Sequence, residues 1–168
     1  MEDGFRLRPA TNADGEAVRA LVFGILRGYG FTPDPAGTDA DLADLEASYF
    51  RGGGTFEILA DAAGRVVGTV GLFPLDVVGG RCELRKMYLD AALRGRGLGK
   101  QLLTHAVARA RELGFIRIEL ETVTVLEVAR RMYESFGFRP CEPRHVTARC
   151  NLAYYLDLAD AEAGTANS

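Results

Sequence analysis

One stretch of the chain constrains the fold more than any other, because a strand, a loop, a helix and a second strand follow one another directly in it. Residues 81–89 alternate as a β-strand does, residues 97–113 carry one apolar stripe at helical spacing, and residues 116–122 alternate again. Two strands joined through a helix pair in parallel within one sheet. This order predicts an α/β (α+β) protein with a mixed sheet and helices packed on it.

The remaining segments add strands and helices to this centre. Strands are expected at 5–8, 55–60, 65–73 and 146–158, and helices at 11–29, 39–50 and 124–135. At the start of the last helix, Thr124 and Glu127 have the spacing of a capping box. Alternation along residues 81–89 predicts two opposite faces, with Glu83, Arg85, Met87 and Leu89 on one and Cys82, Leu84, Lys86 and Tyr88 on the other.

The composition is typical of one compact domain, since the chain has 168 residues of which 48% are hydrophobic and 26% charged. We expect that domain at residues 4–158 and a flexible polar tail at residues 159–168. The net charge of −3 argues against a generic nucleic-acid or anionic-membrane surface. No apolar run approaches the ~18 residues of a membrane span.

Cysteine and histidine usage argues against a metal site. Cys82, Cys141 and Cys150 are an odd number without a C-x-x-C spacing, which excludes a disulfide framework and a cysteine zinc site. His105 and His145 have no ligand partner at i+4, so both are interpreted as structural and no metal is expected. Free cysteines favour a reducing compartment, and no apolar run follows basic residues at the N-terminus. These features predict a soluble cytoplasmic protein.

The loop between the strand at 81–89 and the helix at 97–113 carries the strongest functional signal. Three glycines within five residues let the backbone approach a ligand closely, and the first helical turn offers unpaired N–H groups. Those donors, the helix dipole and the cations Arg94, Arg96 and Lys100 predict a phosphate site. The alternative is a glycine turn whose arginines serve only for solvation.

Two nucleotide-binding patterns do not fit this loop. A P-loop ending at Gly99-Lys100 would require glycine where Arg94 stands and serine or threonine where Gln101 stands. A dinucleotide fingerprint started at Gly95 or at Gly97 reaches Lys100 or Leu102 where its third glycine belongs. The phosphate ligand is therefore expected to belong to another class.

The spacing Arg94-x-x-Gly97-x-Gly99 resembles the acyl-CoA pyrophosphate loop of the GNAT superfamily of N-acetyltransferases. A second family motif, A-x-x-[LM]-Y-x-x-x-G-F, is matched by residues 129–138, and the resemblance extends over residues 5–158. It implies a mixed, mostly antiparallel seven-strand sheet flanked by about four helices. It also implies transfer of an acetyl group from acetyl-CoA to a primary amine of a small molecule or peptide, directly within a ternary complex.

The resemblance implies a set of cofactor-binding residues as well. Pantetheine is expected between the strands at 81–89 and 116–122, and the backbone N–H of Leu89 is the expected oxyanion donor. The position where many members carry a CoA-contacting asparagine holds Leu126 in this chain. The expected acetyl-CoA contacts are Met87, Leu89, Arg94, Gly95, Arg96, Gly97, Leu98, Gly99 and Lys100.

Two residues are candidates for acid–base catalysis. Glu83 lies eleven positions before Arg94, where some family members carry a general-base glutamate. The alternatives are an exposed strand glutamate paired with Arg85 or Arg81, or a base role for Glu119 or Glu121. Tyr133 matches the family tyrosine that protonates the departing CoA thiolate, and the alternative is a core tyrosine.

The acceptor cannot be read directly from the sequence. Acidic residues gather in the segment that walls the acceptor site in this family, where they would favour a cationic amine or form a solvated helix face. These residues are Asp34, Asp39, Asp41, Asp44 and Glu46. A non-catalytic acyl-CoA-binding sensor or interaction domain is the alternative function, and another acyl donor such as succinyl-CoA would satisfy the same loop. A homodimer is the commonest assembly to expect.

Overall fold

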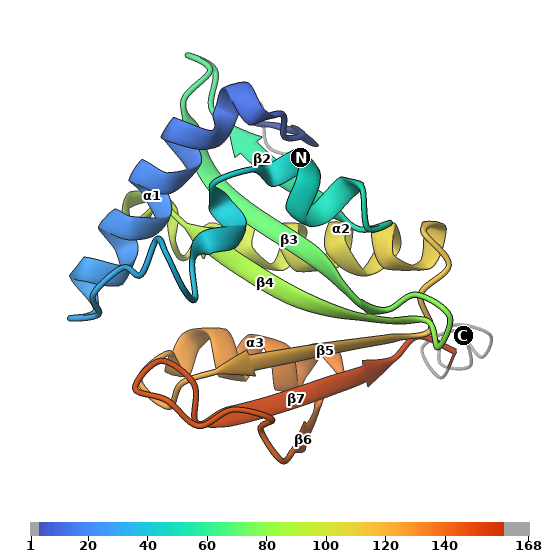
Figure 1. The fold of residues 1–168 in the computed structure, drawn as a ribbon. Helices are drawn as coiled ribbons and strands as arrows, with labels where there is room; N and C mark the ends of the chain where they lie inside the picture. The colour runs from blue at the N-terminus through green and yellow to red at the C-terminus, as the bar shows by residue number, and fades with distance from the viewer. Residues whose placement is uncertain (1–3, 160–168) are drawn as a thin grey trace.

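Seven strands form one sheet in the order β1-β2-β3-β4-β5-β7-β6 in the computed structural model, which describes residues 4–159 (Figure 1). The strands are β1 Arg6–Pro9, β2 Thr55–Ala60, β3 Val66–Asp76, β4 Arg81–Leu89, β5 Arg117–Thr122, β6 Arg139–Cys141 and β7 Leu152–Asp157. The predicted tail at 159–168 lies outside the described residues except for Ala159.

All neighbouring strands pair antiparallel except β4 and β5, which are parallel. The mixed, mostly antiparallel seven-strand sheet is therefore confirmed. The parallel pair is short, because Arg81–Glu83 pair with Arg117–Glu119 and no pairing continues beyond them. From that point β4 and β5 diverge, so the sheet divides into two halves (Figure 1).

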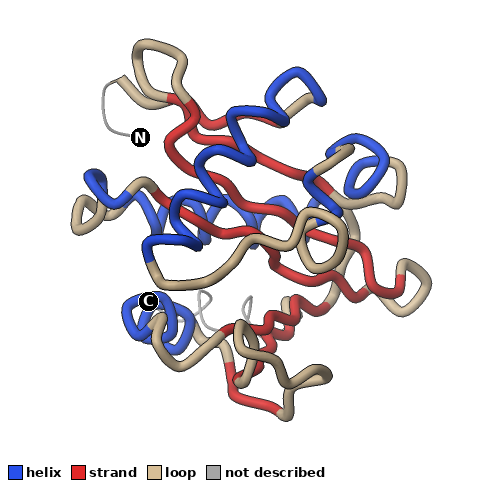
Figure 2. Tube along the Cα trace, turned by 60° about the vertical axis from the view of Figure 1, so that its left-hand side comes forward, coloured by secondary structure: helices blue, strands red, loops and turns tan. Residues whose placement is uncertain are grey.

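Helices cover both faces of the sheet, as Figures 1 and 2 show. Helix α1 (Gly15–Gly28) lies on one face, and α2 (Leu98–Glu112) and α3 (Glu127–Phe136) lie on the other. Each face has its own apolar core: Val18, Val22 and Tyr49 belong to the first, and Leu102 and Ile118 to the second. Helix α2 is the crossover that connects β4 to β5, as the order of elements predicts.

Two local predictions on the helices are wrong. The segment predicted as one helix at 39–50 folds instead as a 3-10 turn at Ala40–Leu42 and a short π-helix at Glu46–Phe50. The capping box is not formed, because α3 begins at Glu127 with Leu126 at its N-cap. Thr124 instead donates its N–H to Oδ1 of Asn151 at 3.0 Å. In both places contacts with distant segments override the local pattern.

The predicted faces of β4 are also wrong beyond Arg85, because the strand contains a β-bulge at Lys86 and Met87. Tyr88 pairs with Thr69 and Arg85 with Gly71, so two residues of β4 lie opposite Val70 alone. Lys86 has φ +52, and the hydroxyl of Thr69 donates to its carbonyl at 2.6 Å. The extra residue reverses the alternation.

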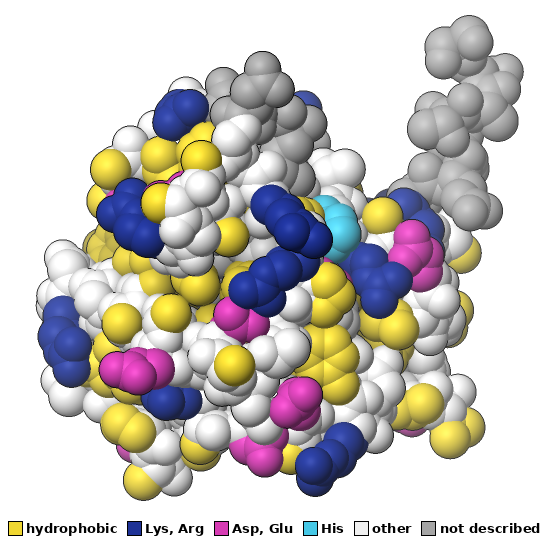
Figure 3. Space-filling view, turned by 90° about the horizontal axis from the view of Figure 1, so that it is seen from above, with side chains coloured by type: hydrophobic (Ala, Val, Ile, Leu, Met, Phe, Trp, Pro, Cys, Tyr) yellow, Lys and Arg dark blue, Asp and Glu magenta, His cyan; other side chains and the backbone are white. Residues whose placement is uncertain are grey.

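As a result Met87 and Leu89 pack in the same core as Cys82 and Leu84, on the α2 side, while Tyr88 packs on the α1 side. Among the described residues no helix is long and apolar enough to cross a membrane. On the face seen in Figure 3, basic and acidic side chains are interspersed rather than gathered into a patch of one sign.

Candidate active site

The divergence of β4 and β5 opens a cavity of about 880 Å³ between the two halves of the sheet. One end of the cavity reaches the N-terminus of α2, at Gly97 and Gly99. The other end is enclosed by the loops around Thr38 and Arg149. The C-terminal end of α1 lies near the glycine loop, since the guanidinium of Arg94 is 5.5 Å from the ring centroid of Tyr29. Side chains at both ends therefore face one continuous space.

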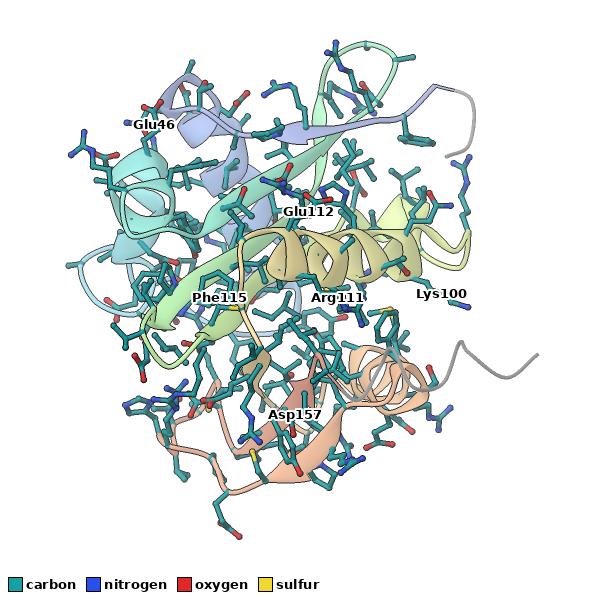
Figure 4. The ribbon with its side chains drawn as sticks, turned by 90° about the vertical axis from the view of Figure 1, so that its right-hand side faces the viewer. Glu46, Lys100, Arg111, Glu112, Phe115 and Asp157 are labelled. Carbon is teal, nitrogen blue, oxygen red and sulfur yellow. The ribbon has the colours of Figure 1, made fainter. Side chains whose placement is uncertain are left out.

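The glycine loop leaves room for a ligand at the N-terminus of α2. Gly95 and Gly97 both have φ +78, and a Cβ added to either would meet no atom within 4 Å. The N–H groups at the start of α2 have no carbonyl within the helix to bond, so they can bind an anion there. Figure 4 shows Lys100 at this end of α2, near α3.

The structure divides the predicted cofactor residues into two groups. Those that line the cavity are Met87, Leu89, Arg94, Gly95, Gly97, Gly99 and Lys100. The other two have different surroundings: the side chain of Leu98 is buried in the core, and the guanidinium of Arg96 lies 5.3 Å from the ring centroid of Phe5. Leu126 lines the cavity as an apolar wall.

Tyr133 lies on α3 with its ring packed near Phe138 and Tyr154, and it lines the cavity. Burial raises the pKa of Tyr133 well above its ordinary value, and the nearby Tyr88 raises it further. The phenol therefore stays protonated across the usual pH range, as a proton donor must. The sequence left a core tyrosine and a catalytic acid as alternatives. Tyr133 packs in the core and also lines the cavity, so its position is compatible with both.

Glu83 lines the cavity from β4 with its carboxylate held by guanidinium groups. Arg85 contacts Oε2 of Glu83 through Nε at 2.9 Å and Nη2 at 2.8 Å, and Arg144 approaches the same oxygen to 3.5 Å. The guanidinium of Arg85 also lies 3.8 Å from the ring centroid of Phe73, which fixes it. All three contacts are made to Oε2, on the side of the carboxylate that Arg85 occupies.

The two alternative bases on β5 have different surroundings. Glu119 is paired with Arg81 at 3.0 Å and lies outside the cavity lining. Glu121 lines the cavity and accepts the backbone N–H groups of Arg144 at 2.8 Å and His145 at 3.2 Å. Burial alone raises the pKa of Glu121, but hydrogen bonds from His145 and Arg144 outweigh it and lower that pKa.

The acidic residues at 34–46 do not form a free anionic wall. Asp39 is almost fully buried, where it accepts Lys86 Nζ at 2.8 Å and both terminal nitrogens of Arg149 at 2.9 Å. Asp41 accepts the hydroxyl of Tyr49. Asp34 and Asp44 accept backbone N–H groups of their own segment, and Glu46 is exposed. Most of these carboxylates are therefore already bound by other groups of the protein.

His105 and Cys82 take no part in the cavity. His105 Nε2 lies 3.6 Å from the buried carboxylate of Glu57 on β2. Burial raises the pKa of the Cys82 thiol to about 12, so the thiol stays protonated. Within residues 4–159 no group of three or more His, Cys, Asp or Glu side chains is arranged to hold a metal ion.

Among the cavity residues that sequence reasoning missed are Lys86, Tyr88, Arg144 and Arg149. Lys86 and Arg149 meet on Asp39 from positions 47 and 110 residues away along the chain. Arg144 and Arg149 come from a loop between β6 and β7 that carries no motif. The spacing of residues within one segment cannot indicate contacts between residues so far apart in the sequence.

Comparison with known proteins is consistent with this architecture. A model of the Acetyltransferase (GNAT) family matches residues 22–138. "Uncharacterized N-acetyltransferase YjgM" of Escherichia coli (strain K12) is 38% identical over 139 residues, which cover 79% of this chain and 80% of that protein. The chain therefore belongs to the GNAT family of acetyltransferases.

Solved structures show the same fold at lower identity. A GNAT-family acetyltransferase from Staphylococcus aureus Mu50 superposes with a TM-score of 0.83 at 24% identity, covering 92% of this chain and 99% of that one. The structure of yncA from Salmonella typhimurium with its cofactor acetyl-CoA superposes with a TM-score of 0.72 at 21% identity, covering 93% and 95%. These similarities support the predicted GNAT fold.

Proposed function

We propose that the protein is an acetyl-CoA-dependent N-acetyltransferase that transfers the acetyl group directly to a primary amine within a ternary complex. The observation that carries the proposal is the single cavity that joins the N-terminus of α2 to Glu83, Glu121 and Tyr133. Direct transfer requires both substrates to be held in one space at the same time. The family membership and the acetyl-CoA found in the yncA structure support the choice of donor.

The residues present fit acetyl-CoA. The open space beside Gly95 and Gly97 suits a pyrophosphate, with Arg94 and Lys100 as counter-charges. Met87, Leu126 and Met132 give the middle of the cavity an apolar wall suited to pantetheine. When bound, acetyl-CoA supplies an acyl group activated as a thioester.

The chain's own groups would then move the protons. A free alkyl ammonium has a pKa near ~10.4, so the amine needs a base, and Glu83 at the cavity wall is our candidate. Tyr133 holds the proton for the leaving sulfur, and the N–H of Leu89 is the candidate oxyanion donor. The cytoplasmic location and the homodimer stay predictions.

A turnover screen tests the proposal. The full chain is incubated with acetyl-CoA and a panel of amino acids, polyamines, aminoglycosides and peptides, and release of the CoA thiol is measured. Amine-dependent release above the hydrolysis rate supports an acetyltransferase. Tight acetyl-CoA binding without turnover on any amine would instead support the non-catalytic acyl-CoA-binding domain.

The loop can be tested by replacing Gly97 with valine. At a hundredfold excess over Kd, acetyl-CoA should stabilise the native protein by about 2.7 kcal/mol. Gly97→Val should abolish this stabilisation, because its side chain would enter the space beside the N-terminus of α2. The measurement is the melting temperature with and without acetyl-CoA.

Gly64→Val is the matched control for this variant. Gly64 has φ +82 and open space around it, but it lies in the turn between β2 and β3, outside the cavity lining. It carries the same backbone strain as Gly97→Val and should keep the full acetyl-CoA shift. An undiminished shift in folded Gly97→Val would place CoA elsewhere.

Tyr133→Phe should lower kcat toward the low end of the ~10²–10⁴ range for acid–base catalysis. The loss is modest because a thiol with a pKa near ~8.5 is already a tolerable leaving group. KM for acetyl-CoA should change little, since the proton is needed only as the C–S bond breaks. Tyr155→Phe, on β7 outside the cavity lining, is the control. A kcat within about twofold of the parent would reduce Tyr133 to a packing role.

A further inference from the structure

The end of the cavity opposite the N-terminus of α2, where the acceptor would bind, is lined by more cationic than anionic side chains. Arg85, Lys86, Arg144 and Arg149 face it, against the carboxylates of Glu83 and Glu121. Three of the four cations are held by short contacts. Arg85 is fixed by Glu83 at 2.8 Å, Lys86 by Asp39 at 2.8 Å, and Arg149 by Asp39 at 2.9 Å.

Arg144 differs from the other three. Its Nη2, Nη1 and Nε lie 3.5, 3.6 and 3.9 Å from carboxylate oxygens of Glu83, Glu119 and Glu121. Each distance exceeds the roughly 2.7–2.9 Å of a charge-assisted hydrogen bond. Its side chain is also 39% exposed, so the guanidinium is accessible from solvent.

The three carboxylates around Arg144 each have a nearer partner. Glu83 has Arg85 at 2.8 Å, and Glu119 has Arg81 at 3.0 Å. Glu121 accepts the backbone N–H of Arg144 itself at 2.8 Å, which also anchors the loop that carries this arginine. The guanidinium therefore lies at the cavity wall, and its closest carboxylate contacts within residues 4–159 are 3.5 Å or longer. An arginine in this state suits a bidentate carboxylate ligand.

The same contacts argue against a purely cationic acceptor. A polyamine would require excess negative charge along the wall, but Asp39 and Asp41 are engaged by Lys86, Arg149 and Tyr49. The wall presents both signs of charge instead. A molecule with an amine and a carboxylate matches such a wall, its amine directed to Glu83 or Glu121 and its carboxylate to Arg144.

We propose that the acceptor is a primary amine that also carries a carboxylate, of the amino-acid type, and that Arg144 binds this carboxylate. This inference rests on the proposed function and specifies its substrate class. Arg144 would thus be a specificity residue, which selects among amines without taking part in the proton transfers.

Matched pairs of amines provide the test. Each pair differs only in the carboxylate: phenylalanine and phenethylamine, lysine and cadaverine, and each amino acid against its amide. In the parent protein we expect kcat/KM to be about tenfold to a hundredfold higher for the carboxylate-bearing member, as for one hydrogen bond to a charged group. Equal or higher kcat/KM for the carboxylate-free members would overturn the inference while leaving the acetyltransferase intact.

Arg144→Gln should bring the ratio within each pair close to one, mainly through a higher KM for the carboxylate-bearing amine, and Arg144→Lys should restore part of it. The control is Arg139→Gln, an exposed arginine on β6 outside the cavity lining, which should keep the parent ratio. A parent-like ratio in folded Arg144→Gln would remove Arg144 from the proposal.

Should no amine turn over, the proposed function fails, and the pairs are compared by the melting shift that each adds to the CoA-bound protein. A larger shift for the carboxylate-bearing members, lost in Arg144→Gln, would still support the binding site. The absence of such a difference would contradict it.

Discussion

Replacing Glu83 with glutamine should lower kcat by about 10²–10⁴, the range expected when a general base is lost. Glutamine keeps the size and shape of the side chain, while its amide oxygen cannot take up the ammonium proton. The partner Arg85 keeps its position over the ring of Phe73, so the local packing should survive. KM for acetyl-CoA should stay nearly unchanged, because Glu83 lies away from the N-terminus of α2.

The measurement is a pH–rate profile of the parent and of three Glu→Gln variants, at positions 83, 119 and 121. If Glu83 is the base, its variant alone should lose the acidic limb. Glu119→Gln is the matched control, since Glu119 is also ion-paired but lies outside the cavity lining. Loss of the limb in Glu121→Gln, with near-normal turnover in Glu83→Gln, would transfer the role to Glu121. That limb should lie at low pH, because hydrogen bonds lower the pKa of Glu121.

Asp39→Asn should destabilise the protein by about 3–5 kcal/mol, the cost of removing one partner from a buried ion pair. The change leaves Lys86 and Arg149 without their shared carboxylate, although their side chains are only 7% and 18% exposed. Asp157→Asn is the control, because the Asp157–Arg117 pair is more exposed and should contribute no more than about 1 kcal/mol. Urea unfolding measures both variants, and a loss below about 1 kcal/mol in Asp39→Asn would contradict the argument.

The same residue predicts a pH dependence of stability. Burial tends to raise the pKa of Asp39, but hydrogen bonds from the side chains of Arg149 and Lys86 and from the backbone N–H of Asp34 outweigh it. The folded-state pKa of Asp39 therefore lies well below the usual range. A depressed folded-state pKa stabilises the protein above the unfolded pKa of about 4, and this stabilisation is lost as the pH falls below it. Asp39→Asn should therefore show a flatter acid limb than the parent in a plot of unfolding free energy against pH.

Most strands and the long helices were predictable because their signals are local, but β6 (Arg139–Cys141) was not predicted, and the segment expected to be extended at 146–158 forms a strand only over Leu152–Asp157. The bounds of β2 and β4 match the predicted 55–60 and 81–89, and Gly137 ends α3 at φ +112 as expected of a C-terminal glycine. The predictions that failed concern features that depend on contacts between residues far apart in the chain. The bulge at Lys86 depends on Thr69 across the sheet and on Asp39 from another layer, neither of which spacing along β4 can indicate.

The residues of the candidate site also fall into two groups, those that local motifs predict and those that depend on contacts between distant segments. The glycine loop and Tyr133 belong to contiguous motifs, so the sequence alone places them. The acidic segment shows the opposite case, since its charges are compatible with a cationic acceptor and with a solvated helix face, and the sequence does not show what the carboxylates contact. Lys86 and Arg149 neutralise Asp39, and the loop that supplies Arg144 adds a cation that no motif marks. Electrostatic character depends on which side chains meet, and composition alone does not determine that.

The short parallel pairing of β4 and β5 has a thermodynamic consequence. Within residues 4–159, β4 and β5 pair at three positions, from Arg81–Arg117 to Glu83–Glu119, and the carbonyl of Gly80 accepts the N–H groups of Ile116 and Arg117 beside them. The half made of β5, β7 and β6 is therefore held to the rest of the sheet mainly by the apolar core that Leu84, Leu102 and Ile118 share, rather than by strand pairing. A ligand lying in the gap contacts both halves and must dissociate before they part. Its binding free energy would then be added to the cost of opening, so that occupancy by substrate regulates the rigidity of the sheet.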